Sequence, residues 1–185
     1  MIVPIAKPFV GPLEKKFSKI AIDSGWISSN GKYIEKFESE INKKLNAKNS
    51  VSCSNGTVAL YMALKALGVG VGDEVIVPDV SFTATINSVI NVGAKPIISE
   101  IDSDNWCIDP KKIIEKITKR TKAIICVHLY GNPCDMKQLI KIKKDYNLFL
   151  IEDAAEAFGS KYQGKFTGTM GDIGCISFFG NKTIS

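Results

Sequence analysis

Lys182 lies among small and aromatic residues in the stretch CISFFGNKTIS, which runs from Cys175 to Ser185. A lysine that is partly desolvated by apolar neighbours can give up its charge, and an uncharged amine is what imine formation with an aldehyde requires. The alternative interpretation is an ordinary lysine that faces solvent. Lys182 therefore indicates covalent aldehyde chemistry only if other residues supply the rest of a site.

A small polar cluster follows the apolar run SVSC and opens a helical pattern: Ser54, Asn55, Gly56 and Thr57. A glycine lets the backbone approach a ligand, a hydroxyl adds a donor, and the free amides at a helix start favour an anion. These residues predict a phosphate site. The alternative is that Ser54 or Thr57 only caps the helix.

An acidic pair, Glu152 and Asp153, follows the apolar run LFLI and precedes two alanines. A carboxylate at the end of a buried strand is costly unless a cation lies against it, and the alanines leave room for a flat group. An unpaired surface acid is the alternative. Phe82 follows EVIVPDVS at another predicted strand end, where its ring could stack on a ligand or fill the core.

Together these four features match one cofactor. A phosphate site, an aromatic ring for stacking, an acid that holds a ring nitrogen protonated and an imine-forming lysine are what pyridoxal 5'-phosphate (PLP) requires. Asp153 and Lys182 are 182 − 153 = 29 residues apart. No metal site is predicted, because the five cysteines are far apart and form no CxxC pair, and the same spacing predicts reduced, buried thiols rather than disulfides.

The segments that must position these residues alternate between two patterns. Apolar strands are predicted at SVSCS, EVIVP, KPIISEI, KAIICVHL and LFLIED, and helices between them at GTVALYMALKALG, TATINSVINVG, PKKIIEKI and MKQLIKIKKDYN. Strands that are apolar on both faces, with intervening helices, indicate a mainly parallel sheet covered on both sides, an α/β three-layer sandwich. Ligands in such sheets bind beyond the carboxyl ends of the strands, where the candidate residues lie.

Two further helices are predicted before this alternation, at PLEKKFSKIAIDSG and KYIEKFESEINKKLN. We therefore divide the sequence into an N-terminal arm with helices, 1–48, and a ligand-binding domain, 49–185. The 24 basic and 19 acidic residues give a net charge of +5, but the lysines are spread over helical stretches, which argues against a nucleic-acid partner. No secretory signal or run of 18 apolar residues occurs, so we expect a cytoplasmic protein that is not bound to a membrane.

The sequence resembles the DegT/StrS family of PLP-dependent sugar-nucleotide aminotransferases, whose fold is that of aspartate aminotransferase, fold type I. The resemblance rests on SNGTVALYMALKALGVGVGDEVIVPDVSFTAT, VHLYGNPCDM, LFLIEDAAEAFGSKYQGKFTGTMGDIGCISFF and GNKTIS, in family order through essentially the whole sequence. WISSNGKYIEKFE, EDAAEAFGS and SFFGNKTI are most similar to the perosamine-type members, which aminate C4 of a GDP-linked 4-keto-6-deoxy sugar.

The resemblance implies a catalytic role for Lys182, which would form the Schiff base with PLP and then move a proton between cofactor and substrate. Asp153 would pair with the pyridinium nitrogen. Relatives that dehydrate sugars have a histidine at the lysine position, so Lys182 favours amino transfer.

The remaining cofactor contacts are also implied by the resemblance. Gly56, Thr57 and Ser177 would hold the phosphate, and Phe82 would lie against the ring. Glu156 would lie near the ring hydroxyl, where many relatives have glutamine.

Three other residues are weaker candidates. His128, the only histidine, lies in the shared stretch VHLYG, and we interpret it as a structural residue near the cleft rather than an acid or base. Trp26 and Ser28 lie in a segment that could approach the nucleotide sugar.

The resemblance implies glutamate as amino donor, a nucleotide-sugar substrate, a homodimer in the full-length form and a role in surface polysaccharide synthesis. A UDP-linked 4-keto amino sugar is the alternative substrate. Family members are about twice this length, so we expect the large-domain part of such an enzyme, with the C-terminal small domain absent and a sheet edge uncovered. A catalytically silent fragment is therefore a further alternative.

Overall fold

The computed structural model describes residues 8–26, 28 and 31–184. The described part of the chain divides into two compact units, one before Cys53 and one at Cys53–Ile184. Each unit is described by itself. Within the stretch WISSNGKYIEKFE, residues 27, 29 and 30 lie outside the described part.

The first unit contains two helices, α1 (Pro12–Asp23) and α2 (Lys32–Leu45). Pro12, at the start of α1, has no backbone N–H that would be left unpaired there. The Glu14 carboxylate accepts a hydrogen bond from the Gly11 amide at 2.7 Å, so residues close in sequence define where this helix begins. α2 ends at Asn46, which adopts a left-handed conformation that stops the helix. Both predicted helices are confirmed.

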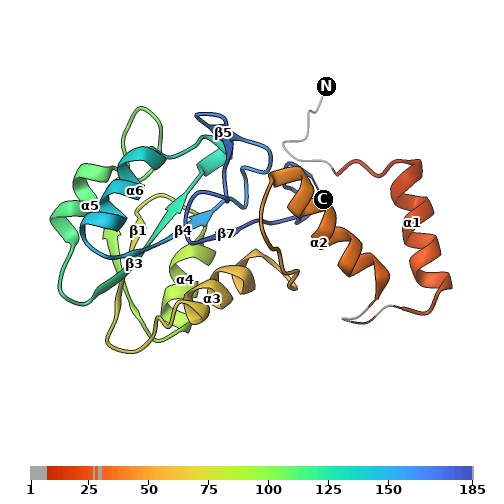
Figure 1. Ribbon diagram of the computed structural model, residues 1–185, viewed down its shortest axis with the longest axis horizontal. Helices are drawn as coiled ribbons and strands as arrows, with labels where there is room; N and C mark the ends of the chain where they lie inside the picture. The colour runs from red at the N-terminus through yellow and green to blue at the C-terminus, as the bar shows by residue number, and fades with distance from the viewer. Residues whose placement is uncertain (1–7, 27, 29–30, 185) are drawn as a thin grey trace, which may run out of the picture. The chain divides into compact units, whose positions relative to one another are not determined.

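The second unit contains a five-stranded sheet in the order β2-β1-β3-β4-β7, and every paired neighbour is parallel. Figure 1 labels β1, β3, β4 and β7 of this sheet. Their bounds are β1 Glu74–Pro78, β2 Lys95–Ser99, β3 Thr121–Val127, β4 Phe149–Asp153 and β7 Ile173–Cys175. A short antiparallel pair, β5 (Lys161–Tyr162) and β6 (Lys165–Phe166), lies outside this sheet.

Helices cover both faces of the sheet, as Figure 1 shows, which confirms the three-layer α/β prediction. One face carries α3 (Gly56–Ala66) and α4 (Thr83–Asn91), and the other carries α5 (Pro110–Lys116) and α6 (Met136–Asp145). Successive strand residues point to opposite faces, so Val75 and Val77 enter the core under α3 and α4 while Ile76 enters the other core. A short 3-10 turn, η1 (Leu129–Gly131), follows β3.

The structure corrects two expectations from the sequence. The run SVSCS is not a strand, and β5, β6 and β7 are strands that the apolar pattern did not predict. Cys107, Cys126, Cys134 and Cys175 are buried free thiols as predicted, but Cys53 is exposed.

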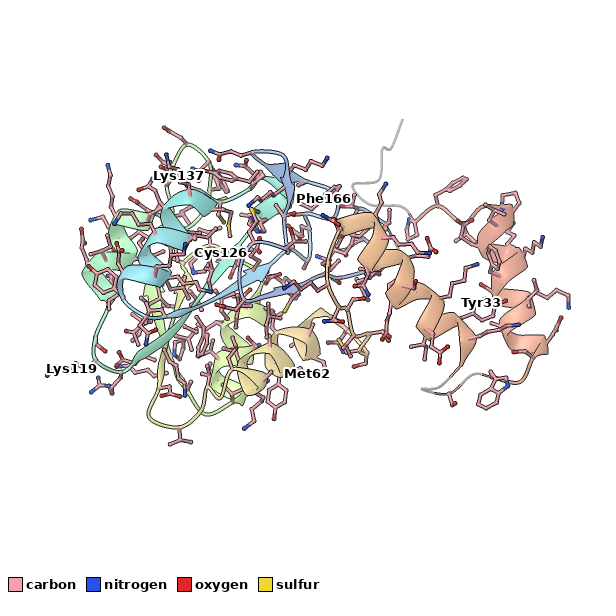
Figure 2. All side chains as sticks on the ribbon, viewed as in Figure 1. Tyr33, Met62, Lys119, Cys126, Lys137 and Phe166 are labelled. Carbon is pink, nitrogen blue, oxygen red and sulfur yellow. The ribbon has the colours of Figure 1, made fainter. Side chains whose placement is uncertain are left out.

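Several lysine side chains lie at the surface of the molecule. Figure 2 shows Cys126 in the interior and Lys119 and Lys137 at the periphery.

Within the described residues, no group of acidic, histidine and cysteine side chains could hold a metal ion. In the same residues, no helix is long and apolar enough to span a membrane.

Candidate functional site

The Lys182 amine lies beside a carboxylate and an aromatic ring. Its Nζ is 3.1 Å from Glu156 Oε1 and 6.0 Å from the centroid of the Phe82 ring. The Lys182 side chain is only 14% exposed, so the solvent-facing alternative is wrong. The Phe82 ring is 71% exposed, so the core-filling alternative is also wrong. The second oxygen of Glu156 accepts the backbone amide of Tyr130 at 3.0 Å, which fixes the carboxylate.

Asp153 ends β4 and points to the same face of the sheet as α4. It is 6% exposed, and its carboxylate accepts the Thr85 hydroxyl at 2.8 Å and the Ala155 amide at 3.2 Å. Burial raises the pKa of Asp153, and these neutral donors offset that effect only in part. The surface-acid alternative is therefore wrong. A cation placed against this carboxylate would offset part of the cost of its burial.

Gly56 and Ser177 form a tight cradle at the start of α3. A Cβ built on Gly56 would lie 3.3 Å from Ser177 Cβ and 3.5 Å from its Oγ, so glycine keeps the space beside this hydroxyl open. Asn55 caps α3, because its side chain accepts the Val58 amide at 2.9 Å. The alternative in which Ser54 or Thr57 is the cap is therefore wrong. The first amides of an α-helix lack intrahelical partners and suit an anion.

Contacts connect these groups into one cluster at the carboxyl ends of the strands. Phe82 precedes α4, its carbonyl accepts the Thr85 amide, and the Thr85 hydroxyl reaches Asp153. Asp153 pairs in register with Cys175 of β7, two residues before Ser177. The lysine, the buried acid, the exposed ring and the cradle thus belong to one region. Such a region can hold a ligand that has an anionic group, a flat ring with a cationic atom, and an aldehyde.

The sequence analysis did not single out two contributors: the Thr85 hydroxyl, which donates to Asp153, and the Tyr130 amide, which donates to Glu156. It named Glu152 and His128 but did not predict that the Glu152 carboxylate accepts a hydrogen bond from His128. The period of two along β4 could have separated the acidic pair, because it places Glu152 and Asp153 on opposite faces. Trp26 and Ser28 belong to the first unit, and their role stays a prediction.

A hollow of about 560 Å³ lies at the amino ends of β3 and β4 and contains none of the predicted residues. Two of its three lysines already have partners, since Lys143 pairs with Asp172 and Lys122 with Asp73. Ligands in parallel α/β sheets bind at the opposite edge. We therefore assign the candidate site to the cluster around Lys182. The hollow is lined by Thr121, Lys122, Lys143, Lys144, Asn147, Leu148, Phe149 and Asp172.

A family model, described as the DegT/DnrJ/EryC1/StrS aminotransferase family, matches residues 12–185. This chain belongs to the DegT/DnrJ/EryC1/StrS aminotransferase family. Among curated relatives, GDP-perosamine synthase of Escherichia coli O157:H7 is 50% identical over 183 residues, which are 99% of this chain and 50% of that protein.

Solved structures agree with the family membership and with the fold. The aminotransferase of Psychrobacter cryohalolentis matches with a TM-score of 0.96 at 37% identity, over 100% of this chain and 47% of that one. Spr1654 of Streptococcus pneumoniae, a sugar aminotransferase by its description and solved in a PLP form, matches with a TM-score of 0.94 at 30% identity, over 100% of this chain and 51% of that one. The chain spans about half the length of the curated family relatives it matches.

Proposed function

We propose that the protein containing this chain is a PLP-dependent aminotransferase that acts on a nucleotide-linked 4-keto-6-deoxy sugar. The observation that carries the proposal is the arrangement of Lys182 and Asp153, a largely buried amine and a buried carboxylate that the contacts of Phe82 and Thr85 bring into one region. The similarity to GDP-perosamine synthases supports a GDP-linked sugar of the 4-keto-6-deoxymannose type.

The residues present fit PLP. Asp153 is a buried carboxylate with neutral donors, as a protonated ring nitrogen requires. The cradle of Gly56 and Ser177, with the Thr57 amide beside it, suits the phosphate. Phe82 exposes a ring that can lie against the cofactor.

Bound PLP supplies an electron sink for the electrons of the bond that breaks during amino transfer. Asp153 would hold the ring nitrogen of the cofactor in its protonated form. Lys182 would hold the cofactor through its amine, and the same amine, once free, would move a proton at the reacting carbon. Glu156 lies 3.1 Å from the Lys182 amine and can hold it in position between these steps.

The remaining parts of the proposal rest on the family. Glutamate is the proposed amino donor, the proposed location is the cytoplasm, and the proposed assembly of the complete protein is a homodimer. The aminated sugar would enter a surface polysaccharide. Parallel assays with GDP-linked and UDP-linked ketosugars test the nucleotide, and a faster reaction with the UDP-linked sugar would overturn that part alone.

Lys182→Ala tests the chemistry directly. The complete protein mixed with PLP should show a visible absorption band of the lysine-attached cofactor, and the variant should lose it. Lys161→Ala is a matched control, because Lys161 also lies over an aromatic ring, 4.4 Å from the Phe166 centroid, but outside the site. A band that persists in Lys182→Ala would show that another residue attaches PLP.

A further inference from the structure

Glu152 is a fully buried carboxylate that the proposed reaction does not use. Its two oxygens accept four hydrogen bonds: His128 Nε2 at 3.0 Å, Gly168 N at 2.8 Å, and Met170 N and Gly171 N at 2.6 Å each. Burial opposes ionisation, but the bond from His128 and the backbone amides outweigh it, so the pKa of Glu152 is lowered. The group is therefore a fully satisfied anion.

The His128 ring is oriented by bonds on both nitrogens. Nδ1 accepts the Cys134 amide at 3.1 Å, so the proton of the neutral ring is on Nε2, where it is donated to Glu152. The backbone amide of His128 also donates to the carbonyl of Asp153 at 3.0 Å. His128 follows β3 and Glu152 lies in β4, so the pair joins the carboxyl ends of two neighbouring strands.

The same carboxylate fixes the loop that leads to the rest of the site. Residues 168–171 bind Glu152 and continue through β7 to Ser177 and Lys182. The loop lies very close to β4, because a Cβ on Gly171 would be 2.6 Å from the carbonyl oxygen of Leu150. From its place in β4 beside Asp153, Glu152 thus binds two other segments, the turn after β3 and the loop that precedes β7 and Ser177.

We propose that Glu152, together with His128, is a positioning residue for the cofactor site. It lies on the face of β4 opposite Asp153 and holds the ends of β3, β4 and β7 in one arrangement. Packed apolar side chains can replace a buried ion at little cost in stability. The charge instead fixes the positions of the hydrogen-bond donors in two segments, His128 after β3 and the 168–171 loop, relative to β4. This inference rests on the proposed use of PLP.

The test compares Glu152→Gln with Glu74→Gln in the complete protein. A glutamine amide at position 152 would place N–H groups against backbone N–H groups, which disturbs the loop. Glu74 is a matched control because it is a 2% exposed carboxylate bound by Thr118 and Arg120 at the amino end of β1. Two quantities are measured well below the unfolding temperature: the Kd for PLP, and the pH midpoint of its visible absorption band.

Glu152→Gln should raise the Kd for PLP about tenfold or more and move the pH midpoint of the band. Glu74→Gln should lower thermal stability and leave both quantities unchanged. If Glu152→Gln changes only the thermal stability, as Glu74→Gln does, Glu152 is structural and the inference is overturned. If the unmodified protein binds no PLP, the proposed function fails, and the inference fails with it.

A second pair of variants decides the matter if Glu152→Gln does not fold. His128→Gln keeps one acceptor and one donor in the side chain, whereas His128→Leu removes both. The inference predicts a Kd for PLP near the unmodified value for His128→Gln and a rise of about tenfold for His128→Leu. Equal Kd values in the two folded variants would overturn it.

Discussion

Glu152 and Asp153 are neighbours in sequence, yet their surroundings are opposite. Glu152 accepts His128 and three backbone amides, whereas Asp153 accepts one hydroxyl and one amide. Burial is the largest single effect on both carboxylates, and it raises their pKa values. The hydrogen-bond donors outweigh burial at Glu152, so its pKa is lowered, whereas they do not outweigh it at Asp153, so its pKa is raised. The protein thus supplies four donors to the Glu152 carboxylate, but only two neutral donors to the Asp153 carboxylate.

The raised pKa of Asp153 predicts how stability depends on pH in the cofactor-free protein. Between the unfolded pKa, about 3.9, and the higher folded pKa, the unfolded state binds fewer protons, so the contribution of Asp153 to stability is lost as pH rises. In Asp153→Asn the side chain at position 153 does not titrate, so this pH dependence is absent. Its free energy of unfolding relative to the unmodified protein should therefore increase from about pH 4 upward, as measured by denaturant unfolding at several pH values.

Glu152→Gln is the internal control with the opposite sign. The lowered pKa of Glu152 stabilises the folded state above the unfolded pKa, and this stabilisation is lost as pH falls through the folded pKa. The deficit of Glu152→Gln should therefore be largest near neutral pH and shrink in acid. Parallel pH curves for the two variants would contradict the assignment of these carboxylates to different environments.

At the scale of elements, the close approach of β7 to the 168–171 loop depends on glycine. A Cβ on Gly174 would lie 2.0 Å from the carbonyl oxygen of Gly168, so the backbone would have to move. Gly174→Ala should reduce the free energy of unfolding by about 1–3 kcal/mol. Gly70→Ala is the control, because the nearest atom to its added Cβ is 3.8 Å away, and it should change stability by about 0.5 kcal/mol or less. Chemical denaturation measures both, and equal losses would contradict the steric argument.

Strand ends were the most predictable feature of the sequence. EVIVP and LFLIED are continuous apolar runs followed by polar residues, and they became β1 and β4 with the same carboxyl ends. β7 could not be predicted, because its three residues, Ile173–Cys175, form a strand only through pairing with β4. SVSCS failed for the converse reason: its β-branched and small residues have no strand partner.

For the candidate site, the sequence predicted the main residues but not all of their contacts. Lys182, Asp153, Phe82 and Glu156 were found from residue type and resemblance, and the structure brings them together. Their roles toward PLP stay predictions. The partner of Glu152 could not be predicted, because His128 is 24 residues earlier and reaches it only through the pairing of β3 with β4.

At the scale of the whole molecule, every residue proposed to contact PLP lies in the unit Cys53–Ile184. A ligand that binds only the folded state stabilises the unit that binds it, by about 2.7 kcal/mol at a concentration of 100 Kd. That corresponds to about a hundredfold slower hydrogen exchange for amides that exchange by unfolding of this unit. We therefore expect PLP to slow exchange in β1, β3 and β4 and to leave α1 and α2 unchanged.

Hydrogen exchange followed by mass spectrometry measures this difference for each peptide of the chain. Lys182→Ala is the control, since weaker cofactor binding should reduce the added protection in β1, β3 and β4. Equal added protection in α1, α2 and the sheet would show that the two units unfold as one cooperative body. Protection confined to β1, β3 and β4 would instead show that PLP stabilises only the unit that carries Asp153 and Lys182. A bound ligand slows hydrogen exchange only where exchange requires an unfolding event that releases the ligand.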